Sequence, residues 1–455
     1  MYDYLGVKYM EQTMKKGLMT EGVIWKELLF FSIPLLLGNL FQQLYNTVDS
    51  IVVGNFCGKN ALAAVGSSNP IINLLVSFFM GIAIGAGVII SRYFGARNEA
   101  KLHDAVHTSI ALTIIAGLIM TVLGFIASPW ILEMVGTPAK VMDNSVLYLQ
   151  IYFLGIIGVM VYNMGSGILR AIGDSKNPLY FLIISSLTNI VLDLLFVVVF
   201  KMGIAGAAWA TLISQVLSAV LTMILLIRSK AEYRIIPKDI KIEKTMMKDI
   251  IRIGLPSGVQ NAIVSFSNVI VQSNINSFGA NAMAGCGAYT KIDGFAILPV
   301  MSFSMAMTTF VGQNMGAKKY DRVKQGAKTG VFMSCAVTGS IALILFLFAP
   351  NFLRVFSQDE KVLYYGVLMM RTVVPGYLCL AVSHALSGVI RGAGLTTVPM
   401  IVMVACWCFL RMVIILGFMP VFHNIQVVFW GYTLTWTASA ICMYIYYKKA
   451  NWLHR

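Results

Sequence analysis

The sequence predicts an all-α integral membrane protein with twelve transmembrane helices, arranged as two six-helix bundles related by a pseudo-twofold axis. Its composition is one basis: 58% of the 455 residues are hydrophobic and 12% are charged, whereas about 25% of residues are charged in a soluble domain. Apolar segments long enough to cross about 30 Å of hydrocarbon also recur along the chain. Isolated strands could not satisfy their backbone polar groups in lipid, so each segment is expected to be a helix.

The predicted spans follow one another closely along the chain. They cover residues 28–54, 61–90, 106–132, 143–168, 178–200, 204–228, 253–277, 283–311, 329–353, 362–389, 398–421 and 427–447. The first 27 residues contain no apolar core followed by a small-residue cleavage site, so no signal peptide is expected and the first span serves as the insertion signal.

An internal repeat is the third observation behind this fold class. The two halves of the chain align at an offset of 221 residues. Residues 58–66 (GKNALAAVG) align with 279–287 (GANAMAGCG), 95–97 (GAR) with 316–318 (GAK), and 169–173 (LRAIG) with 390–394 (IRGAG). One residue out of that register, Pro34 matches Pro256. Repeats of this kind place the substrate sites of membrane transporters at the interface between halves.

The repeat also divides the chain into parts. We expect a cytoplasmic N-terminal segment (1–27), a six-helix bundle (28–228), a cytoplasmic linker (229–252), a second six-helix bundle (253–447) and a cytoplasmic tail (448–455). The loop 228–252 carries eight basic and four acidic residues. Because six is even, each half enters and leaves on the same side, which makes the halves parallel repeats about an axis along the membrane normal.

Basic residues predict the orientation. Of 34 lysines and arginines, 26 fall on the side shared with the N-terminus, five fall on the opposite side and three lie within spans. The positive-inside rule therefore places both termini in the cytoplasm, and a multi-pass protein of the cell membrane is expected. This distribution accounts for the net charge of +15 without nucleic acid as a partner. The expected partners are the bilayer and small organic molecules, and the protein is expected to be a monomer.

The motifs of several catalytic and metal-binding classes are absent from the sequence. It has no P-loop, HExxH helix or GxSxG elbow, and its seven cysteines form no pair of CxxC motifs. His103 and His107 are spaced i, i+4, but no acidic third ligand lies in register with them, so no metal site is expected there. We therefore expect no cofactor and no enzymatic activity, and any transport should be driven by an ion gradient.

Acidic residues within the spans point to a cation site. Only three of the nineteen acids fall in spanning segments away from their ends, namely Asp49, Asp193 and Asp293, and a charge at bilayer depth costs on the order of 2.5–3.5 kcal/mol. Asn189 lies one helical turn before Asp193, on the same helix face. Thr211 and Asp49 can complete an oxygen-rich site with this pair, suited to Na⁺ or to a shared proton.

Five sequence motifs resemble those of a known family. These are Ile33-Pro34, residues 48–54 (VDSIVVG), 61–66 (ALAAVG), 95–97 (GAR) and 169–174 (LRAIGD). Together they are similar to the multidrug and toxic compound extrusion (MATE) transporters, and the resemblance covers essentially the whole chain. It implies secondary active efflux of bulky, often cationic compounds by antiport against H⁺ or Na⁺.

The resemblance is closer to the DinF-like branch of that family. It implies a cation site in the amino-terminal bundle, built from an acid in the first helix, an Asn-x-x-x-Asp pair in the fifth and a threonine in the sixth. Those positions fall on Asp49, Asn189, Asp193 and Thr211. The neutral oxygen ligands of Asn189 and Thr211 favour Na⁺ as at least one coupling ion.

The repeat does not extend to this site. Asp193 maps to Ile414 and Asn189 to Leu410 in the second half. The NorM-like branch of the family is known for an acidic residue in the seventh helix, whereas residues 253–277 contain none. We therefore expect the second bundle to provide packing and substrate surface, with the main cation site in the first bundle.

Asp293 leaves several interpretations open. It can be a second proton site or a substrate contact, together with Lys291 two residues before it, or it can pair with Arg371 or Arg411. Lys291 and Asp293 project from different helix faces.

Two alternatives to multidrug efflux were weighed. A lipid-linked sugar flippase of the same superfamily commonly has fourteen helices, and the cleft here lacks an evident basic lining for pyrophosphate. A polytopic membrane enzyme needs a polar cluster near one membrane face, and the sequence offers none. Gly81-x-x-x-Gly85 and Gly388-x-x-x-Gly392 permit close helix contact.

Overall fold

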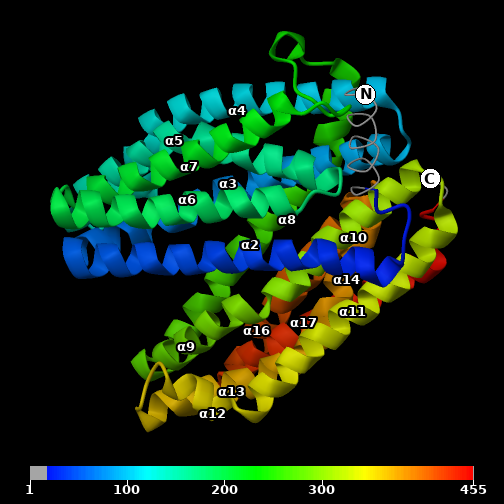
Figure 1. The fold of residues 1–455 in the computed structure, drawn as a ribbon. Helices are drawn as coiled ribbons and strands as arrows, with labels where there is room; N and C mark the ends of the chain where they lie inside the picture. Colours follow the sequence, from blue (N-terminus) through cyan, green and yellow to red (C-terminus); the bar gives the residue numbers. More distant parts are fainter. Residues whose placement is uncertain (1–17, 454–455) are drawn as a thin grey trace. The chain divides into compact units, whose positions relative to one another are not determined.

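The computed structural model describes residues 18–453, and within that range the chain consists of helices and loops without a strand (Figure 1). The elements of the first half are α2 (Ile24–Val52), η1 (Val53–Cys57), α3 (Lys59–Gly95), α4 (Glu99–Met134), α5 (Ala139–Ala171), α6 (Lys176–Asp193), η2 (Leu194–Val199), α7 (Gly203–Arg228) and η3 (Pro237–Asp239).

The second half continues the helical pattern with shorter segments. Its elements are α8 (Lys244–Asn276), α9 (Ala280–Ala296), α10 (Leu298–Gly316), α11 (Tyr320–Leu347), α12 (Ala349–Arg354), α13 (Glu360–Val373), η4 (Val374–Gly376), α14 (Tyr377–Gly392), α15 (Thr397–Met403), η5 (Val404–Leu410), α16 (Arg411–Phe422) and α17 (Gln426–Lys449).

All twelve predicted spans are helical. Ten helical segments in the described part of the chain are long and apolar enough to cross a membrane. The other two predicted spans, 253–277 and 427–447, belong to α8 and α17. Polar residues such as Gln260 and Gln272 make α8 less apolar than its neighbours. The predicted fold class, an all-helical membrane protein, is confirmed.

Several helices begin earlier than the hydropathy pattern indicates. The third span was predicted to begin at residue 106, whereas α4 begins at Glu99, directly after Asn98. The side chain of Asn98 accepts a hydrogen bond from the backbone N–H of Lys101 at 3.1 Å, which caps the helix. Hydropathy marks the part of a helix that suits lipid, whereas the helix itself continues into polar residues. His103 and His107 therefore lie within α4.

The chain divides into two compact units that do not coincide with the predicted bundles. Unit 1 contains Leu37–Gly258, and unit 2 contains Met19–Leu36 with the chain from Val259 onward. The helices α2 and α8 each begin in one unit and end in the other, and each crosses the boundary soon after a repeat-related proline, Pro34 or Pro256. The duplication is therefore reflected in where the chain passes between units.

The repeat extends to backbone conformation. At three pairs of repeat-related positions the backbone has positive φ. The pairs are Gly58 and Gly279 (84° and 90°), Arg97 and Lys318 (52° and 59°), and Gly173 and Gly394 (93° and 87°). A left-handed conformation costs a non-glycine residue roughly 1–2 kcal/mol. Its presence at both Arg97 and Lys318 shows that the two halves use the same turn after α3 and after α10.

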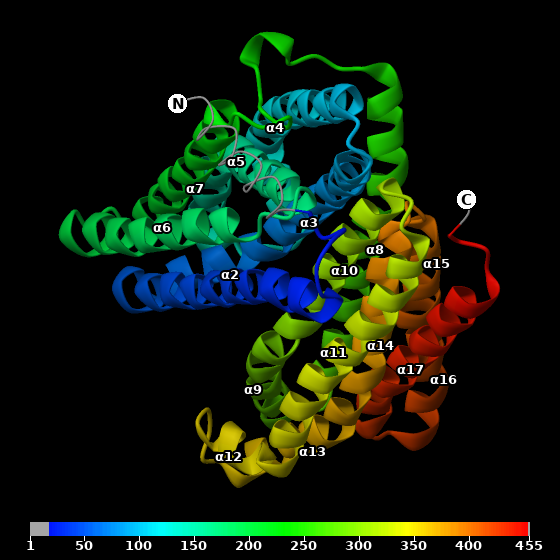
Figure 2. The ribbon, with the colours of Figure 1, turned by 45° about the vertical axis from the view of Figure 1, so that its right-hand side comes forward.

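In unit 1, α5 occupies a central position. It packs against α3, α4 and α7, and Figure 2 shows these helices side by side. Glycines allow the close approach of α7: a Cβ added to Gly155 would lie 2.8 Å from Cγ of Leu212, and one added to Gly158 would lie 3.2 Å from Cα of Val216. Van der Waals contact between close backbones is what holds helices together in lipid.

The loop after α7 lies along unit 1. The backbone N–H of Ile235 donates to the carbonyl of Leu226 at 3.1 Å. The linker was predicted to extend to residue 252, whereas α8 begins at Lys244. The carboxylate of Glu243 accepts a hydrogen bond from the backbone N–H of Met246 at 2.6 Å and a second one from the backbone N–H of Thr245. The two hydrogen bonds hold the pKa of the Glu243 carboxyl below its usual range. The last part of the predicted linker, residues 244–252, is therefore helix.

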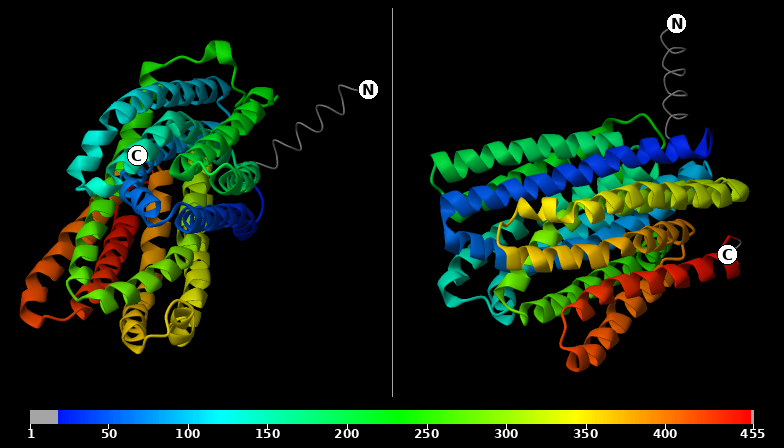
Figure 3. Two further views of the ribbon diagram at one scale, coloured as in Figure 1. Left: turned by 90° about the vertical axis from the view of Figure 1, so that its left-hand side faces the viewer. Right: turned by 90° about the horizontal axis from the view of Figure 1, so that it is seen from below.

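In unit 2, α14 has the central role. It packs against α10, α11 and α17, and Figure 3 shows the yellow, orange and red helices of this unit running alongside one another. The predicted close contact at the Gly388–Gly392 pair is confirmed: a Cβ added to Gly388 would lie 2.3 Å from the carbonyl oxygen of Ser304, and one added to Gly392 would lie 2.6 Å from that of Thr308.

The Gly81–Gly85 pair gives a stability prediction. A Cβ added to Gly81 would lie 2.2 Å from the backbone nitrogen of Gly258 on α8, so Gly81→Ala forces two backbones apart. We expect a loss of about 1–3 kcal/mol, the usual cost of overpacking, seen as a lower melting temperature of the detergent-purified protein. Gly66→Ala, on the same helix with open space around it, is the matched control. Equal melting temperatures for both variants would contradict this packing.

Candidate functional site

The predicted Asn–Asp pair lies in the interior of unit 1. Asn189 and Asp193 are one turn apart on α6, and neither side chain has any exposed surface. Within the described residues, neither carboxylate oxygen of Asp193 has a hydrogen-bond partner, and the same is true of both polar atoms of the Asn189 amide. Burial of such groups without partners costs free energy, which a bound cation or proton can recover.

Asp49 faces this pair from α2. Its carboxyl group interacts with that of Asp193, and its buried Oδ1 has no hydrogen-bond partner in the part of the chain described. Two π-helical segments follow these acids: η1 begins at Val53, one turn after Asp49, and η2 begins directly after Asp193. Single π-turns inside helices are frequent at functional sites. The structure thus brings together two of the three intramembrane acids.

Thr211 lies on the helix that packs against this pair. It is buried on α7, which is antiparallel to α6. The hydroxyl of Ser185 on α6 donates to the backbone carbonyl of Ser214 on α7 at 2.6 Å, which fixes the register of the two helices. Asn189 lies one turn after Ser185 on α6, and Thr211 lies about one turn before Ser214 on α7. Because the two helices are antiparallel, Asn189 and Thr211 lie at the same level.

Two tyrosines interact with the acids, and a third tyrosine and a glutamine adjoin those tyrosines; the sequence analysis did not identify these four residues. Tyr45 and Tyr148 interact electrostatically with both Asp49 and Asp193, and Tyr152 interacts with both of these tyrosines. The hydroxyl of Tyr45 also hydrogen-bonds the side chain of Gln215. Spacing offered a partial signal, because Tyr45 lies one turn before Asp49 and Tyr148 lies one turn before Tyr152.

The donor set suits a small hard cation. Its carboxylates come from α2 and α6 and lie together, the Asn189 amide lies on the same face of α6, and the Thr211 hydroxyl is on the neighbouring helix α7; no sulfur or imidazole ligand is among these four predicted residues. Oxygen donors of this kind bind Na⁺ or a proton in preference to a transition metal. In a buried environment, two neighbouring carboxylates need at least one positive charge or proton between them.

Unit 2 has different chemistry at the corresponding stretch of sequence. Directly after Leu410, which corresponds to Asn189, Arg411 is buried. Its guanidinium donates to Asn268 Oδ1 and to Thr435 Oγ1, each at 3.3 Å, and lies 4.4 Å from the ring centroid of Tyr432. A cation–π contact and two neutral hydrogen bonds therefore hold this charge. Unit 2 thus has Leu410 and Ile414 in place of the Asn–Asp pair and a fixed arginine next to them, which makes the two units unequal.

Asp293 has tyrosine partners. Its Oδ1 accepts hydrogen bonds from the hydroxyl of Tyr289 at 3.2 Å and from the hydroxyl of Tyr377. The interpretation that pairs Asp293 with an arginine is wrong: the guanidinium of Arg411 is bound elsewhere, Arg371 is exposed on α13, and no ion pair to Asp293 exists among the described residues. Lys291 is exposed on α9.

Unit 1 also contains an apolar cavity of about 250 Å³. Residues of α3, α4, α5 and α8 line it, among them Phe79, Leu112, Met160 and Leu255. Asn163 and Thr113 are its polar lining residues, and the Asn163 amide already donates to the carbonyl of Val159 at 2.9 Å. None of the four predicted cation-site residues lines this cavity, so it is a separate apolar space.

The spans and the buried acidic site together are typical of a polytopic membrane transporter. A family model described as MatE matches residues 34–195 and, a second time, residues 256–416. The chain therefore belongs to the MatE family, and the double match reproduces the internal repeat.

Named relatives cover most of the chain. It is 30% identical over 392 residues to the probable multidrug resistance protein YoeA of Bacillus subtilis (strain 168), covering 84% of this chain and 85% of that protein. It is 26% identical to the probable multidrug resistance protein NorM of Thermotoga maritima, covering 83% and 82%. It is 23% identical to the multidrug export protein MepA of Staphylococcus aureus (strain N315), covering 82% of each.

Solved structures of this family have the same fold. A MATE structure in complex with MaL6 matches with a TM-score of 0.89 and 23% identity, over 95% of this chain and 97% of that chain. An outward-facing multidrug resistance MATE transporter of the MOP superfamily matches with a TM-score of 0.87 and 24% identity, over 94% and 96%. The fold predicted from the sequence is therefore that of MATE transporters.

Proposed function

We propose that this protein exports small organic compounds, often cationic, by antiport with Na⁺ or H⁺. The relatives named as multidrug resistance or export proteins support the substrate class. The observation that carries the coupling chemistry is the pair of neighbouring carboxylates in unit 1, Asp49 and Asp193, with the unpartnered amide of Asn189 beside them. The site needs a cation or proton for charge balance, so its occupancy can control the transport cycle.

An ion gradient supplies enough free energy for this function. A membrane potential of about 100 mV gives about 2.3 kcal/mol per charge, and each pH unit gives about 1.4 kcal/mol per proton. One coupling ion can therefore support a gradient of an uncharged compound of roughly 100-fold without ATP, since each factor of ten costs about 1.4 kcal/mol.

The ligands favour Na⁺ as one coupling ion. A proton needs only a carboxylate, whereas Na⁺ gains from additional neutral oxygens. Asn189 lies one turn from Asp193 on α6, and Thr211 lies at the level of Asn189 on α7, so both can provide such oxygens. We assign Na⁺ as at least one coupling ion, and the acid–Asn-x-x-x-Asp–Thr pattern supports placement in the DinF-like branch.

Vesicle transport tests the proposed function. In inside-out membrane vesicles, an imposed gradient with high Na⁺ in the lumen should cause accumulation of a fluorescent cationic compound, and a lumen acidic relative to the medium should be tested separately. Vesicles with the Asp193→Asn variant are the control for leak and adsorption. If accumulation requires ATP and is the same with and without the Na⁺ and H⁺ gradients, the result would contradict ion-coupled antiport.

Sodium is expected to stabilise the purified protein. A ligand present at 100 times its dissociation constant adds about 2.7 kcal/mol to the stability of the state that binds it, so saturating Na⁺ should raise the melting temperature by several degrees relative to K⁺ at equal ionic strength. The shift should vanish in Asp193→Asn. If Na⁺ and K⁺ give the same melting temperature in the wild type, proton coupling alone is the better account.

The second acid of interest is Asp293 in unit 2. We assign it as a second proton site, supported by its two tyrosine hydroxyl partners and by the lack of an ion-pair partner in the described residues. Lys291, exposed on the same helix, is assigned at most a substrate contact. The proposed setting is a monomer in the cell membrane with both termini in the cytoplasm.

A further inference from the structure

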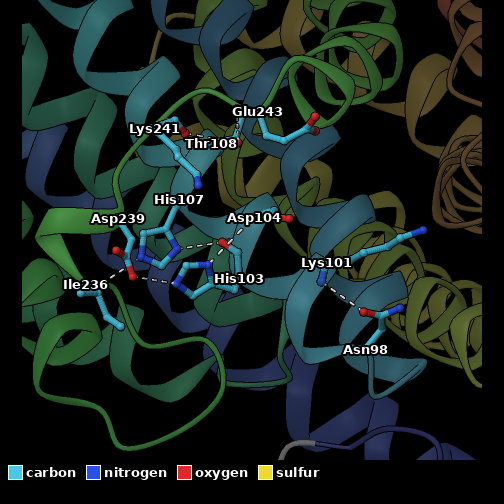
Figure 4. A network of polar contacts seen from close by, with 10 residues as sticks. All are labelled: Asn98, Lys101, His103, Asp104, His107, Thr108, Ile236, Asp239, Lys241 and Glu243. Carbon is cyan, nitrogen blue, oxygen red and sulfur yellow. Dashed lines mark hydrogen bonds and ion pairs between the residues drawn. The ribbon is translucent and has the colours of Figure 1, made fainter.

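Two histidines of α4 meet an aspartate from the linker (Figure 4). His103 and His107 lie one turn apart, with ring centroids 3.8 Å from each other. His103 Nε2 lies 3.4 Å from Oδ2 of Asp239, the last residue of η3. One ligand atom from each of the three residues lies within 4.8 Å of the other two. The expectation that no acidic third ligand accompanies these histidines is therefore wrong, because the fold supplies one from a distant part of the sequence.

Both imidazoles have an oxygen atom on their Nδ1 side. Nδ1 of His107 hydrogen-bonds the backbone carbonyl of His103 at 2.7 Å, whereas Nδ1 of His103 lies 3.9 Å from Oδ1 of Asp104, beyond hydrogen-bond distance. A histidine that binds a metal through one nitrogen usually places the other against a carbonyl or carboxylate, which fixes the ring and its tautomer. The His107 ring is held in this way, and Nε2 of both rings faces the linker.

The tautomer of His107 follows from its two hydrogen bonds. Its Nδ1 faces a carbonyl and must carry the proton, while Nε2 accepts the backbone N–H of Ile236 at 2.9 Å. The Nε2 lone pair therefore points at the linker, as a metal ligand requires. The next residue, Thr108, accepts the backbone N–H of Glu243 at 3.1 Å, so both ends of this stretch of linker are bound to α4.

We propose that His103 Nε2, His107 Nε2 and the Asp239 carboxylate bind a divalent transition metal ion, with Zn²⁺ the expected class and water as the fourth ligand. Two imidazoles and a carboxylate form a three-ligand zinc set with one open position. Ligand atoms around tetrahedral zinc are about 3.3 Å apart, so any of the three ligand-atom distances that is longer than this must shorten when the ion binds. Asp239 can move toward the histidines because its side chain is 45% exposed at the end of a short turn.

Binding also changes how the linker is held. The ion must displace the Ile236 N–H from His107 Nε2, so one neutral hydrogen bond is exchanged for three metal–ligand bonds. The linker would then be fixed to α4 through Asp239 itself. His103 is 32% exposed and gives the ion access from solvent. This site is independent of the proposed antiport chemistry, since it shares no residue with the cation site at Asp49 and Asp193.

Metal titration of the full-length protein tests the site. The protein is purified in detergent with its affinity tag removed, because a histidine tag binds the same ions. Co²⁺ is titrated as a spectroscopic probe, and Zn²⁺ stoichiometry is measured by equilibrium dialysis. We expect one Zn²⁺ per chain and cobalt d–d absorption in the visible. His103→Ala and Asp239→Asn should each weaken binding at least tenfold, whereas His423→Ala, which removes an exposed histidine elsewhere, should leave it unchanged.

Trypsin provides a second measurement that reports on the linker. Lys238 and Lys241 flank the proposed ligand Asp239, so bound Zn²⁺ should slow cleavage there several-fold in the wild type and have no effect in Asp239→Asn. The test uses His103 and Asp239 because both are partly exposed, whereas His107 is buried and its replacement can unfold α4. Absence of Zn²⁺ binding in the wild type, or equal binding by wild type, His103→Ala and Asp239→Asn, would overturn the proposal.

Discussion

Asp193→Asn is expected to abolish ion-coupled efflux and to leave the protein folded. Asparagine has almost the same shape as aspartate but cannot carry the negative charge that holds a proton or Na⁺. No donor among the described residues reaches the carboxylate of Asp193, and its one polar neighbour is the carboxyl group of Asp49, with which an asparagine amide can still form a hydrogen bond. Removal of a buried charge also removes a desolvation cost, and the melting temperature should stay level or rise.

Reconstituted transport measures this effect. Wild type and variant are placed in proteoliposomes at equal protein content, and efflux driven by an imposed Na⁺ or H⁺ gradient is recorded. Asp49→Asn should behave in the same way because its carboxyl group interacts with that of Asp193. Asp143→Asn is the matched control, since this acid is exposed on α5. Wild-type rates in the purified Asp193→Asn protein would show that the cation site lies elsewhere.

The Asn189–Asp193 part of the site could be predicted because it is local. An i, i+4 spacing places two side chains on one face of any α-helix, and the cost of a charge in lipid directs attention to the few acids in spans. Tyr148 comes from α5, which carries neither acid, so no spacing along α2 or α6 indicates it, whereas Tyr45 precedes Asp49 by one turn of α2. Helix packing determines such neighbours, and the repeat could not help because the second half lacks the site.

Asp293 shows a different limit. The sequence identified the acid correctly as unusual, but the partner search considered only opposite charges. Neutral hydroxyls also stabilise a buried carboxylate, and Tyr289 and Tyr377 fill that role here. The same reasoning applies to Asp239: its position in the linker places it far from His103 along the chain, and only the path of the loop across α4 brings the two together.

Asp293→Asn is expected to remove proton coupling at unit 2 without unfolding it. The amide oxygen of asparagine can still accept from the hydroxyls of Tyr289 and Tyr377, so the loss of stability should stay near the cost of weakening two hydrogen bonds, about 1–3 kcal/mol. Asparagine cannot exchange a proton. Efflux driven by a pH gradient alone should therefore fall at least tenfold and lose its pH dependence, while efflux driven by Na⁺ at constant pH should continue.

Tyr377→Phe separates proton exchange from packing. This variant removes one hydrogen bond to Asp293 and keeps the acid, so it should cost similar stability but retain pH-dependent efflux. Melting temperature and efflux over a range of pH are measured for both variants under each gradient. If Asp293→Asn melts far below Tyr377→Phe and its remaining efflux still follows pH like the wild type, Asp293 has a structural role only. Coupling would then reside in unit 1 alone, at Asp49 and Asp193.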